Sequence, residues 1–424
     1  MSVRLPLAVI GLLAWLASPL PARADDADAL MLADTAPGKM QTASDLQWYG
    51  EFAAGRSTRR DANAVASTRR LSLDMRLDMR LDSSIAPGWR GVLADRLDVN
   101  WPAPSSGERS VNTLKEAYLS WQAQDNYIVD IGRINAPSGV ATGYNPTDFL
   151  RAQALRSVVS VDPSSLKKNR LGSVMLRGQT LWSSGSLTAL YAPKLAERAS
   201  DAGFSLDLGA TNHADRWLLL LSQRLGDDFN PQWLIYGEAH QSPQLGFNLT
   251  RVLGDAVVAF VEWSGGRSRT QWSQASSVPE AASFHNRLAT GATYTAANKL
   301  SLTLEYAYAG AALDATAWNA LQRGAPAAYG LYRNWVQSAL ELPTKEVVTL
   351  YASWPDAIAR HLDLSAMLRF NLADKSRLNW LEARYRWEHV DLALQWQVNS
   401  GNRGSEFGTL PLSRAWQLAL RNYF

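Results

Sequence analysis

The chain has 424 residues, no cysteine, 17 tryptophans and 14 tyrosines. The lack of cysteine excludes disulfide scaffolds, thiolate metal sites and cysteine nucleophiles. Without Arg4 and Arg23, which fall in the N-terminal segment described next, the 42 basic residues become 40 against 39 acidic ones. This near balance gives no electrostatic case for nucleic acid as a partner.

The first residues have the layout of a secretory signal peptide. Arg4 supplies the positive charge, an apolar run follows from Leu5 to Leu20, and Ala22-Arg23-Ala24 matches an A-x-A cleavage site. The run is shorter than the roughly 20 residues that a spanning helix needs. We therefore expect a signal peptide over 1–24, cleavage after Ala24 and a flexible, polar periplasmic lead-in over 25–43.

The clearest pattern in the mature chain is the stretch from Arg70 to Asp82, where apolar and charged residues alternate with a period of two. Leucine and methionine occupy one face of such a strand, and arginine and aspartate occupy the other. Thirteen alternating positions exceed the usual five or six residues of a soluble strand. A strand with one apolar and one ionic face is typical of a barrel wall between lipid and a watery lumen.

The same alternation recurs along the chain, and tryptophan and tyrosine tend to lie near the strand ends, as in the girdles of membrane barrels. We expect strands at 45–54, 70–84, 89–101, 113–123, 127–135, 174–182, 187–191, 217–225, 233–241, 245–253, 256–264, 284–295, 300–309, 347–354, 362–370, 378–387, 390–398 and 413–424. This predicts an all-β fold, a transmembrane antiparallel up-and-down β-barrel of about 18 strands, within bounds of about 16 to 20, over 44–424.

Four longer segments interrupt the alternation and are expected to be extracellular loops: 136–168, 193–214, 265–283 and 310–345. Within the last of them, Tyr332 to Leu342 fits either a strand or an amphipathic helix. Only its assignment to the loop keeps long and short connections alternating between the two rims.

The last strand carries apolar residues on alternate positions back from a terminal aromatic: Trp416, Leu418, Leu420 and Phe424. With the signal peptide and the alternating strands, this ending resembles that of the Gram-negative outer-membrane β-barrel porins. The resemblance implies insertion by the barrel-assembly machinery, a cell outer-membrane location, and an N-terminus and short turns in the periplasm. The strand number and the arginine-rich lumen are also loosely similar to alginate-export type barrels. The run from Gly143 to Phe149 has the look of a family signature without an assigned role.

The strand pattern predicts which charged residues point into the lumen. A charged residue facing lipid would cost about 2–4 kcal/mol at the midplane, so these side chains are expected to face water. On the stretch 70–82, mutual cross-strand pairing is favoured over contact with solutes. The predicted lumen lining is Arg70, Asp74, Arg76, Asp78, Arg80, Asp82, Arg90, Arg96, Arg369, Glu382, Arg384 and Arg386, with Glu116, Asp130, Arg177, Glu238, Glu262 and Glu305 also inward.

The loop 136–168 is the candidate constriction, because a long loop without its own pattern is usually functional or disordered. If it folds into the barrel, its excess of basic residues favours anionic solutes. The alternative is a surface loop with ordinary solvated charges, and the sequence leaves both open. The candidate solute-binding residues are Arg151, Arg156, Lys167, Lys168, Arg170 and Asp148.

An enzyme is not expected, because the five histidines are scattered and neither H-E-x-x-H nor G-x-S-x-G occurs. The sequence favours a porin, a passive channel for small hydrophilic and conceivably anionic solutes, which needs no cofactor or metal. Its expected partners are outer-membrane lipid, the assembly machinery and a solute. A homo-oligomer is compatible with the apolar exterior. The rival hypotheses are an export conduit for a polysaccharide-type polymer and a structural or adhesive barrel with ligand-binding loops.

Overall fold

The computed structural model describes residues 45–60, 67–102, 108–226 and 229–424. These form a closed antiparallel β-barrel of 18 strands, in which each strand pairs with the next along the chain. Pairing between β1 and β18 completes the ring. The predicted fold and strand number are therefore confirmed, while the expected signal peptide and lead-in lie outside the described residues.

The observed strands agree with the expected ones within about four residues at each end, except that β1 continues to Arg60 beyond the expected end at 54. They are β1 (Asp45–Arg60), β2 (Ser67–Ala86), β3 (Trp89–Trp101), β4 (Ser110–Gln124), β5 (Tyr127–Ile134), β6 (Ser173–Trp182), β7 (Gly185–Ala192), β8 (Arg216–Gln223), β9 (Gln232–Glu238), β10 (Gln244–Leu253), β11 (Val257–Ser268), β12 (Ser283–Thr295), β13 (Ser301–Ala309), β14 (Glu346–Trp354), β15 (Leu362–Asn371), β16 (Arg377–Arg386), β17 (Val390–Ser400) and β18 (Leu412–Tyr423).

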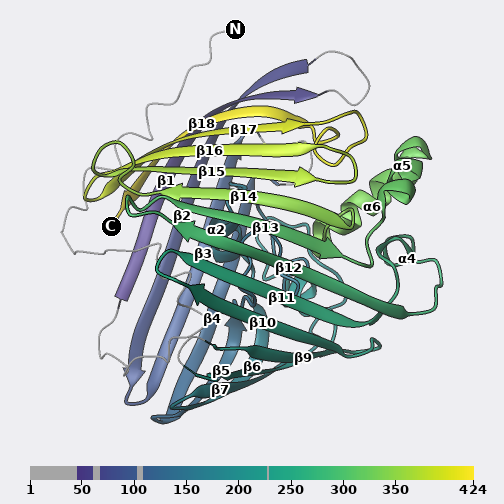
Figure 1. Cartoon of the computed structure of the whole chain (residues 1–424). Coiled ribbons are helices and arrows are strands. Elements are labelled where there is room, and N and C mark those ends of the chain that lie inside the picture. Colours follow the sequence, from purple (N-terminus) through teal and green to yellow (C-terminus); the bar gives the residue numbers. More distant parts are fainter. Residues whose placement is uncertain (1–44, 61–66, 103–107, 227–228) are drawn as a thin grey trace.

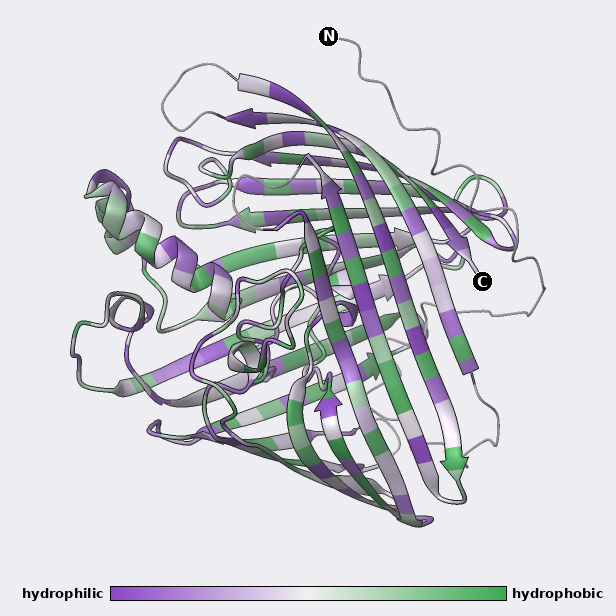
Figure 2. Ribbon diagram, turned by 180° about the vertical axis from the view of Figure 1, so that it is seen from behind, coloured by the Kyte–Doolittle hydropathy of each residue, from purple (hydrophilic) through white to green (hydrophobic). Residues whose placement is uncertain are grey.

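The alternation on β2 determines which way its side chains point. Leu71 and Leu73 are 73% and 54% exposed on the outside of the ring, whereas Arg76 and Asp78 are 5% and 7% exposed on the inside. The same banding of hydrophobic and hydrophilic positions is visible along most strands (Figure 2). Because a strand changes face at every residue, one register places the whole apolar set outside and the whole ionic set inside.

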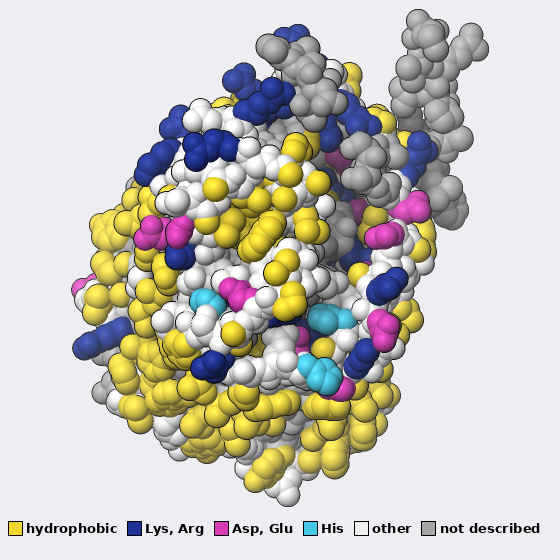
Figure 3. All heavy atoms as spheres, turned by 90° about the vertical axis from the view of Figure 1, so that its right-hand side faces the viewer, with side chains coloured by type: hydrophobic (Ala, Val, Ile, Leu, Met, Phe, Trp, Pro, Cys, Tyr) yellow, Lys and Arg dark blue, Asp and Glu magenta, His cyan; other side chains and the backbone are white. Residues whose placement is uncertain are grey.

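The ends of the barrel differ in the length of their connections. Short turns join β2 to β3, β4 to β5 and β6 to β7 at the end that also holds the start of β1 and the C-terminus (Figure 1). There Trp48 stacks on Phe424 with ring centroids 3.8 Å apart. The opposite end carries the long connections, and Figure 3 views it with a largely hydrophobic flank and Lys and Arg gathered along its upper edge.

The described residues contain five short helices, all in the long connections: α2 (Pro163–Lys168), α3 (Leu208–Thr211), α4 (Gln271–Ser276), α5 (Ala315–Arg323) and α6 (Pro326–Ala339). Most of the ambiguous stretch from Tyr332 to Leu342 thus belongs to a helix, packed through Tyr332 and Val336 against Trp318 of α5. Among the described residues, none of the helices is both long and apolar enough to cross a membrane.

Candidate pore constriction

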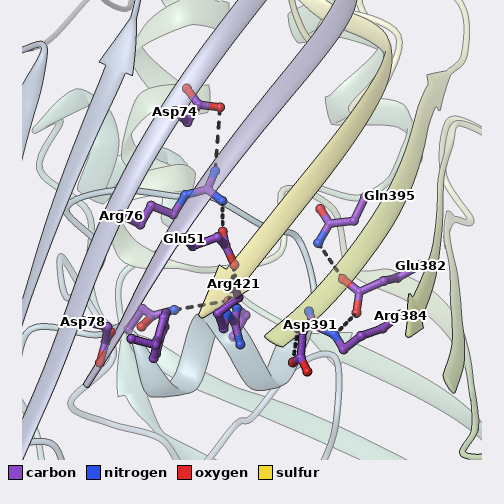
Figure 4. A network of polar contacts seen from close by, with 12 residues as sticks. Glu51, Asp74, Arg76, Asp78, Glu382, Arg384, Asp391, Gln395 and Arg421 are labelled. Atoms are coloured by element: carbon purple, nitrogen blue, oxygen red, sulfur yellow. Dashed lines mark hydrogen bonds and ion pairs between the residues drawn. The ribbon is translucent and has the colours of Figure 1, made fainter. Parts of the chain in front are cut away.

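A network of ion pairs covers the inner face of β1 to β4 and β18, and all the predicted lumen residues of β2 and β3 lie on that face. Arg76 of β2 pairs with Glu51 of β1, which also accepts from Arg421 of β18 at 2.8 Å (Figure 4). Lys115 of β4 reaches Asp78 at 2.7 Å. Most partners therefore come from neighbouring strands, because adjacent inward residues on antiparallel strands face each other directly.

Three further pairs extend the network along β2, β3 and β4. Arg96 binds Asp98 at 2.9 Å, and Arg90 binds Asp82. Arg80 pairs with Glu116 of β4, and its side chain stays 37% exposed. The ladder is therefore nearly self-neutralised, while its less buried members remain open to the lumen.

A second network lies on β15 to β17. Arg384 donates to Glu382 at 2.9 Å and approaches Asp391 of β17 at 3.2 Å (Figure 4). Arg386 pairs with Asp363 at 2.6 Å, and Arg369 lies 3.9 Å from Glu406 in the connection between β17 and β18. The predicted lumen residues of this side are thus inward and paired as well.

Residues 135–172, here called the crossing segment, leave the wall after β5 and return to it at β6. Phe149 stacks on Tyr236 of β9 with centroids 4.6 Å apart, and Val161 packs on the cluster of Met367 and Trp380 from β15 and β16. Since β15 lies about half the ring away from β5 and β6, contacts on both sides mean that the segment spans the lumen. Figure 2 shows this coil inside the barrel.

Two inward carboxylates of the wall hold the crossing segment by its backbone. Glu305 of β13 accepts from the amides of Thr142, Gly143 and Tyr144 at 2.8–3.2 Å. Glu262 of β11 accepts from the amide and the hydroxyl of Thr147, both at 2.9 Å. Such charge-assisted bonds are about twice as strong as neutral ones.

Glu262 also accepts from the amides of Val140 and Ala141 and from the side chain of Asn145. The run that starts at Gly143 is therefore the docking element of the segment. Gly139 has φ +94°, and a Cβ built on it would lie 2.3 Å from a Glu262 oxygen, so only glycine permits this approach.

A third carboxylate comes from the connection that follows α6. Glu341 meets Arg151 at 2.6 Å and accepts from the Tyr144 hydroxyl at 2.6 Å. Burial alone would raise the pKa of Glu341, but Arg151 and Arg287 outweigh it and hold the pKa below its ordinary value. The carboxylate is therefore charged at neutral pH and ties two distant connections together.

The other candidate residues of the segment are likewise engaged. Arg170 pairs with Asp148, and Arg156 lies 3.3 Å from Asp207 and donates to the carbonyls of Ser205 and Ala202. Lys167 donates to the carbonyl of Ala141 at 2.9 Å, and burial lowers its pKa.

The structure therefore brings Asp148, Arg151, Arg170 and Lys167 into one folded unit, with Arg156 at its edge beside the connection between β7 and β8. Lys168 ends α2 and stays exposed. The three arginines do not form a free basic cluster, because Arg170 pairs with Asp148 of the segment itself and Arg151 and Arg156 pair with carboxylates of other connections. The segment and its partners thus place charges of both signs across the lumen.

The sequence predicted that Glu262 and Glu305 point into the lumen, but it did not indicate that they anchor the crossing segment. It gave no indication of Glu341. The run Gly143 to Thr147 was a usable signal, because glycine, asparagine and threonine together suit close backbone docking. Nothing local marks Glu341, since its partner Arg151 lies 190 residues away.

His285 contacts the hydroxyls of Ser268 and Ser283 at 3.1 and 3.3 Å. Within the described ranges, no group of three or more His, Asp or Glu side chains is placed to hold a metal ion.

No family model matches the sequence, and no curated protein matches it. Solved structures do resemble the fold. OccAB1 of Acinetobacter baumannii matches with a TM-score of 0.55 at 10% identity over 89% of this chain and 96% of that one. The outer membrane protein OpdK of Pseudomonas aeruginosa matches with 0.53 at 8% identity over 90% and 99%, and OccK5 (OpdH) of the same species with 0.51 at 12% over 90% and 98%. None of the three is an alginate-export barrel, so these comparisons lend no support to that resemblance.

Proposed function

We propose that the chain is an outer-membrane channel through which small hydrophilic solutes diffuse passively. The observation that carries the proposal is the crossing segment, which wall carboxylates fix across an otherwise continuous barrel. A barrel with an apolar exterior and an ionic interior suits a membrane, and a fixed inward segment limits the size of what passes.

The passage proposed for solutes runs between the crossing segment and the ionic face of β1 to β3 and β18. The contacts of the segment described above fall on strands from β4 to β16 and on the long connections. The opposite sector carries the ladder of Glu51, Arg76 and Arg421, whose fixed charges of both signs suit hydrated solutes. A preference for anions remains a prediction, since Arg151, Arg156 and Arg170 of the segment are each paired with a carboxylate.

The proposal includes the topology that the outer-membrane resemblance implies. The short turns and both chain ends lie in the periplasm, the long connections lie outside, and the chain starts at Asp25 after processing. A fixed segment across the lumen disfavours passage of a thick polymer, which is why a small-solute channel is preferred to an export conduit.

Purified protein in a planar bilayer tests the proposal. We expect stepwise conductance with weak ion preference from the complete mature chain. Silence from samples that migrate as folded barrels on unheated gels would overturn passive conduction and favour an adhesive barrel. Conductance that appears only after residues 140–168 are replaced by a short Gly-Ser linker would instead favour a gated export pore.

A further inference from the structure

The outer surface of β1, β2 and β18 carries a cluster of arginines at the end with the long connections. Arg69 and Arg414 flank Thr58 in one row of the sheet, because both are register partners of Thr58. One row nearer the middle, Arg56 stands between Leu71 and Trp416. With strands about 4.8 Å apart, the three guanidinium groups can converge on one small anion.

These arginines point away from the lumen. Arg56 shares its row with Leu71 and Trp416, which are 73% and 48% exposed on the outside. Arg56, Arg69 and Arg414 are exposed, and within the part of the chain that the structure describes none of them forms a hydrogen bond or an ion pair. Arg60 is not part of this cluster, because its guanidinium group donates a hydrogen bond to the carbonyl of Leu410 at 3.0 Å.

The cluster surrounds a recess of the surface. An open hollow of about 390 Å³ is lined by Arg56, Thr58, Arg69, Arg414 and Trp416. Its wall thus combines three cations, one hydroxyl and one indole ring. The surrounding sequence is also positively charged, because residues 56–70 contain five arginines and a single acidic residue, Asp61.

The height of the recess matches a headgroup layer. Trp48, stacked on Phe424, marks the opposite rim, and Arg56 lies eight residues further along β1. At about 3.3 Å per residue and a tilt of about 40°, this is about 20 Å along the barrel axis, with Thr58 about 5 Å higher. The intervening outward residues, including Phe52 and Leu420, are apolar. An outward apolar band of a membrane barrel is about 25 Å tall, so the arginines stand at its upper edge.

We infer that Arg56, Arg69 and Arg414 bind the phosphate of a phosphorylated outer-leaflet lipid headgroup, with Trp416 packed against the first acyl carbons. Guanidinium groups bind phosphate oxygens in a bidentate manner, and the indole ring prefers the interface between headgroup and acyl chain. The inference rests on the outer-membrane placement proposed above and is independent of conduction.

Native mass spectrometry of the complete mature chain in detergent tests the site, with bisphosphorylated lipid A as probe. We expect the triple variant Arg56→Gln, Arg69→Gln, Arg414→Gln to lose at least tenfold in apparent affinity. Arg251→Gln is the matched control, because Arg251 is an exposed outward arginine near the opposite rim of β10. That control should bind within twofold of the unaltered protein, and the corresponding triple lysine variant within about fivefold.

The inference would be overturned if the triple glutamine variant retained lipid A within twofold, or if Arg251→Gln lost as much affinity. Full competition by inorganic phosphate at the same molar concentration would also overturn it, because that result would indicate a site for free anions. A changed oligomeric mass with unchanged lipid binding would likewise overturn it in favour of a contact between copies. Bilayer conductance of the same variants reports separately on the proposed channel and should not change.

Discussion

Arg151 and Glu341 stand 190 residues apart in the chain, yet their side chains meet at 2.6 Å. The first belongs to the crossing segment and the second to the connection between α6 and β14. Their ion pair is buried and is reinforced by the Tyr144 hydroxyl, so it fixes one side of the constriction.

Arg151→Gln, or Glu341→Gln, leaves one buried charge without its partner. We expect each single variant to lose about 3–5 kcal/mol of unfolding free energy if the pair unfolds together with the barrel. Urea unfolding in lipid vesicles measures this loss. Arg386→Gln, at the more exposed pair with Asp363, is the control and should cost about 1 kcal/mol or less. If Arg386→Gln lost as much unfolding free energy as Arg151→Gln, the buried pair would have no special role in stability.

The same ion pair predicts a dependence on pH. The folded pKa of Glu341 is held below the ordinary value of 4.5, so the contribution of Glu341 to stability is fully present above about 4.5 and is lost as the pH falls through the lower folded pKa. We expect single-channel current to become noisier in that acidic window. Because other carboxylates also titrate there, the measurement is the difference from Glu341→Gln, whose current should lack this component.

In Glu305→Gln, one of the two carboxylate oxygens that accept from three backbone amides is replaced by an NH2 group, which can only donate. The crossing segment should detach locally while the barrel itself stays folded, because the strand ladder does not depend on it. We expect a larger open-channel conductance and faster proteolysis within 140–168. Glu238→Gln controls for charge, since the Glu238 carboxylate accepts hydrogen bonds from Tyr236 and Gln241, close to its own strand. An unchanged conductance in Glu305→Gln would refute the anchoring role.

Gly139→Ala tests the close approach of the segment to Glu262. The added Cβ would lie 2.3 Å from a carboxylate oxygen, at a φ of +94° that alanine disfavours. A destabilisation of about 1–3 kcal/mol is expected. Gly178→Ala on β6 is the matched control, because nothing lies within 4 Å of its Cβ position and its φ is ordinary. Comparable melting temperatures for both variants would argue against a tight fit at Gly139.

Arg156→Gln combined with Lys168→Gln removes two cations at the edge of the constriction. Because Arg151, Arg156 and Arg170 are all paired with carboxylates, we expect only weak ion preference in the unaltered channel. The double variant leaves Asp207 without its partner, so we expect its selectivity to shift toward cations. Reversal potentials in a salt gradient measure both. If the reversal potential does not move, these residues lie outside the path of the ions.

The sequence by itself determined the wall. The alternation of Leu71, Arg76 and their neighbours specifies a strand, and the same pattern repeated to Phe424 specifies the number of strands and which face meets water. This works because the period of two is a local property and because one register shift would expose the whole ionic face to lipid.

Only the tertiary structure decided what fills the barrel. The basic residues of the loop read as a free positive cluster, since their sequence neighbours include few acids. Folding paired Arg151 with Glu341, 190 residues away, and Arg156 with Asp207. It also placed the carboxylates of Glu262 and Glu305 against backbone amides of the same segment. Pairing at such separations depends on how the closed ring brings opposite walls within reach of one segment, and no local pattern encodes that distance.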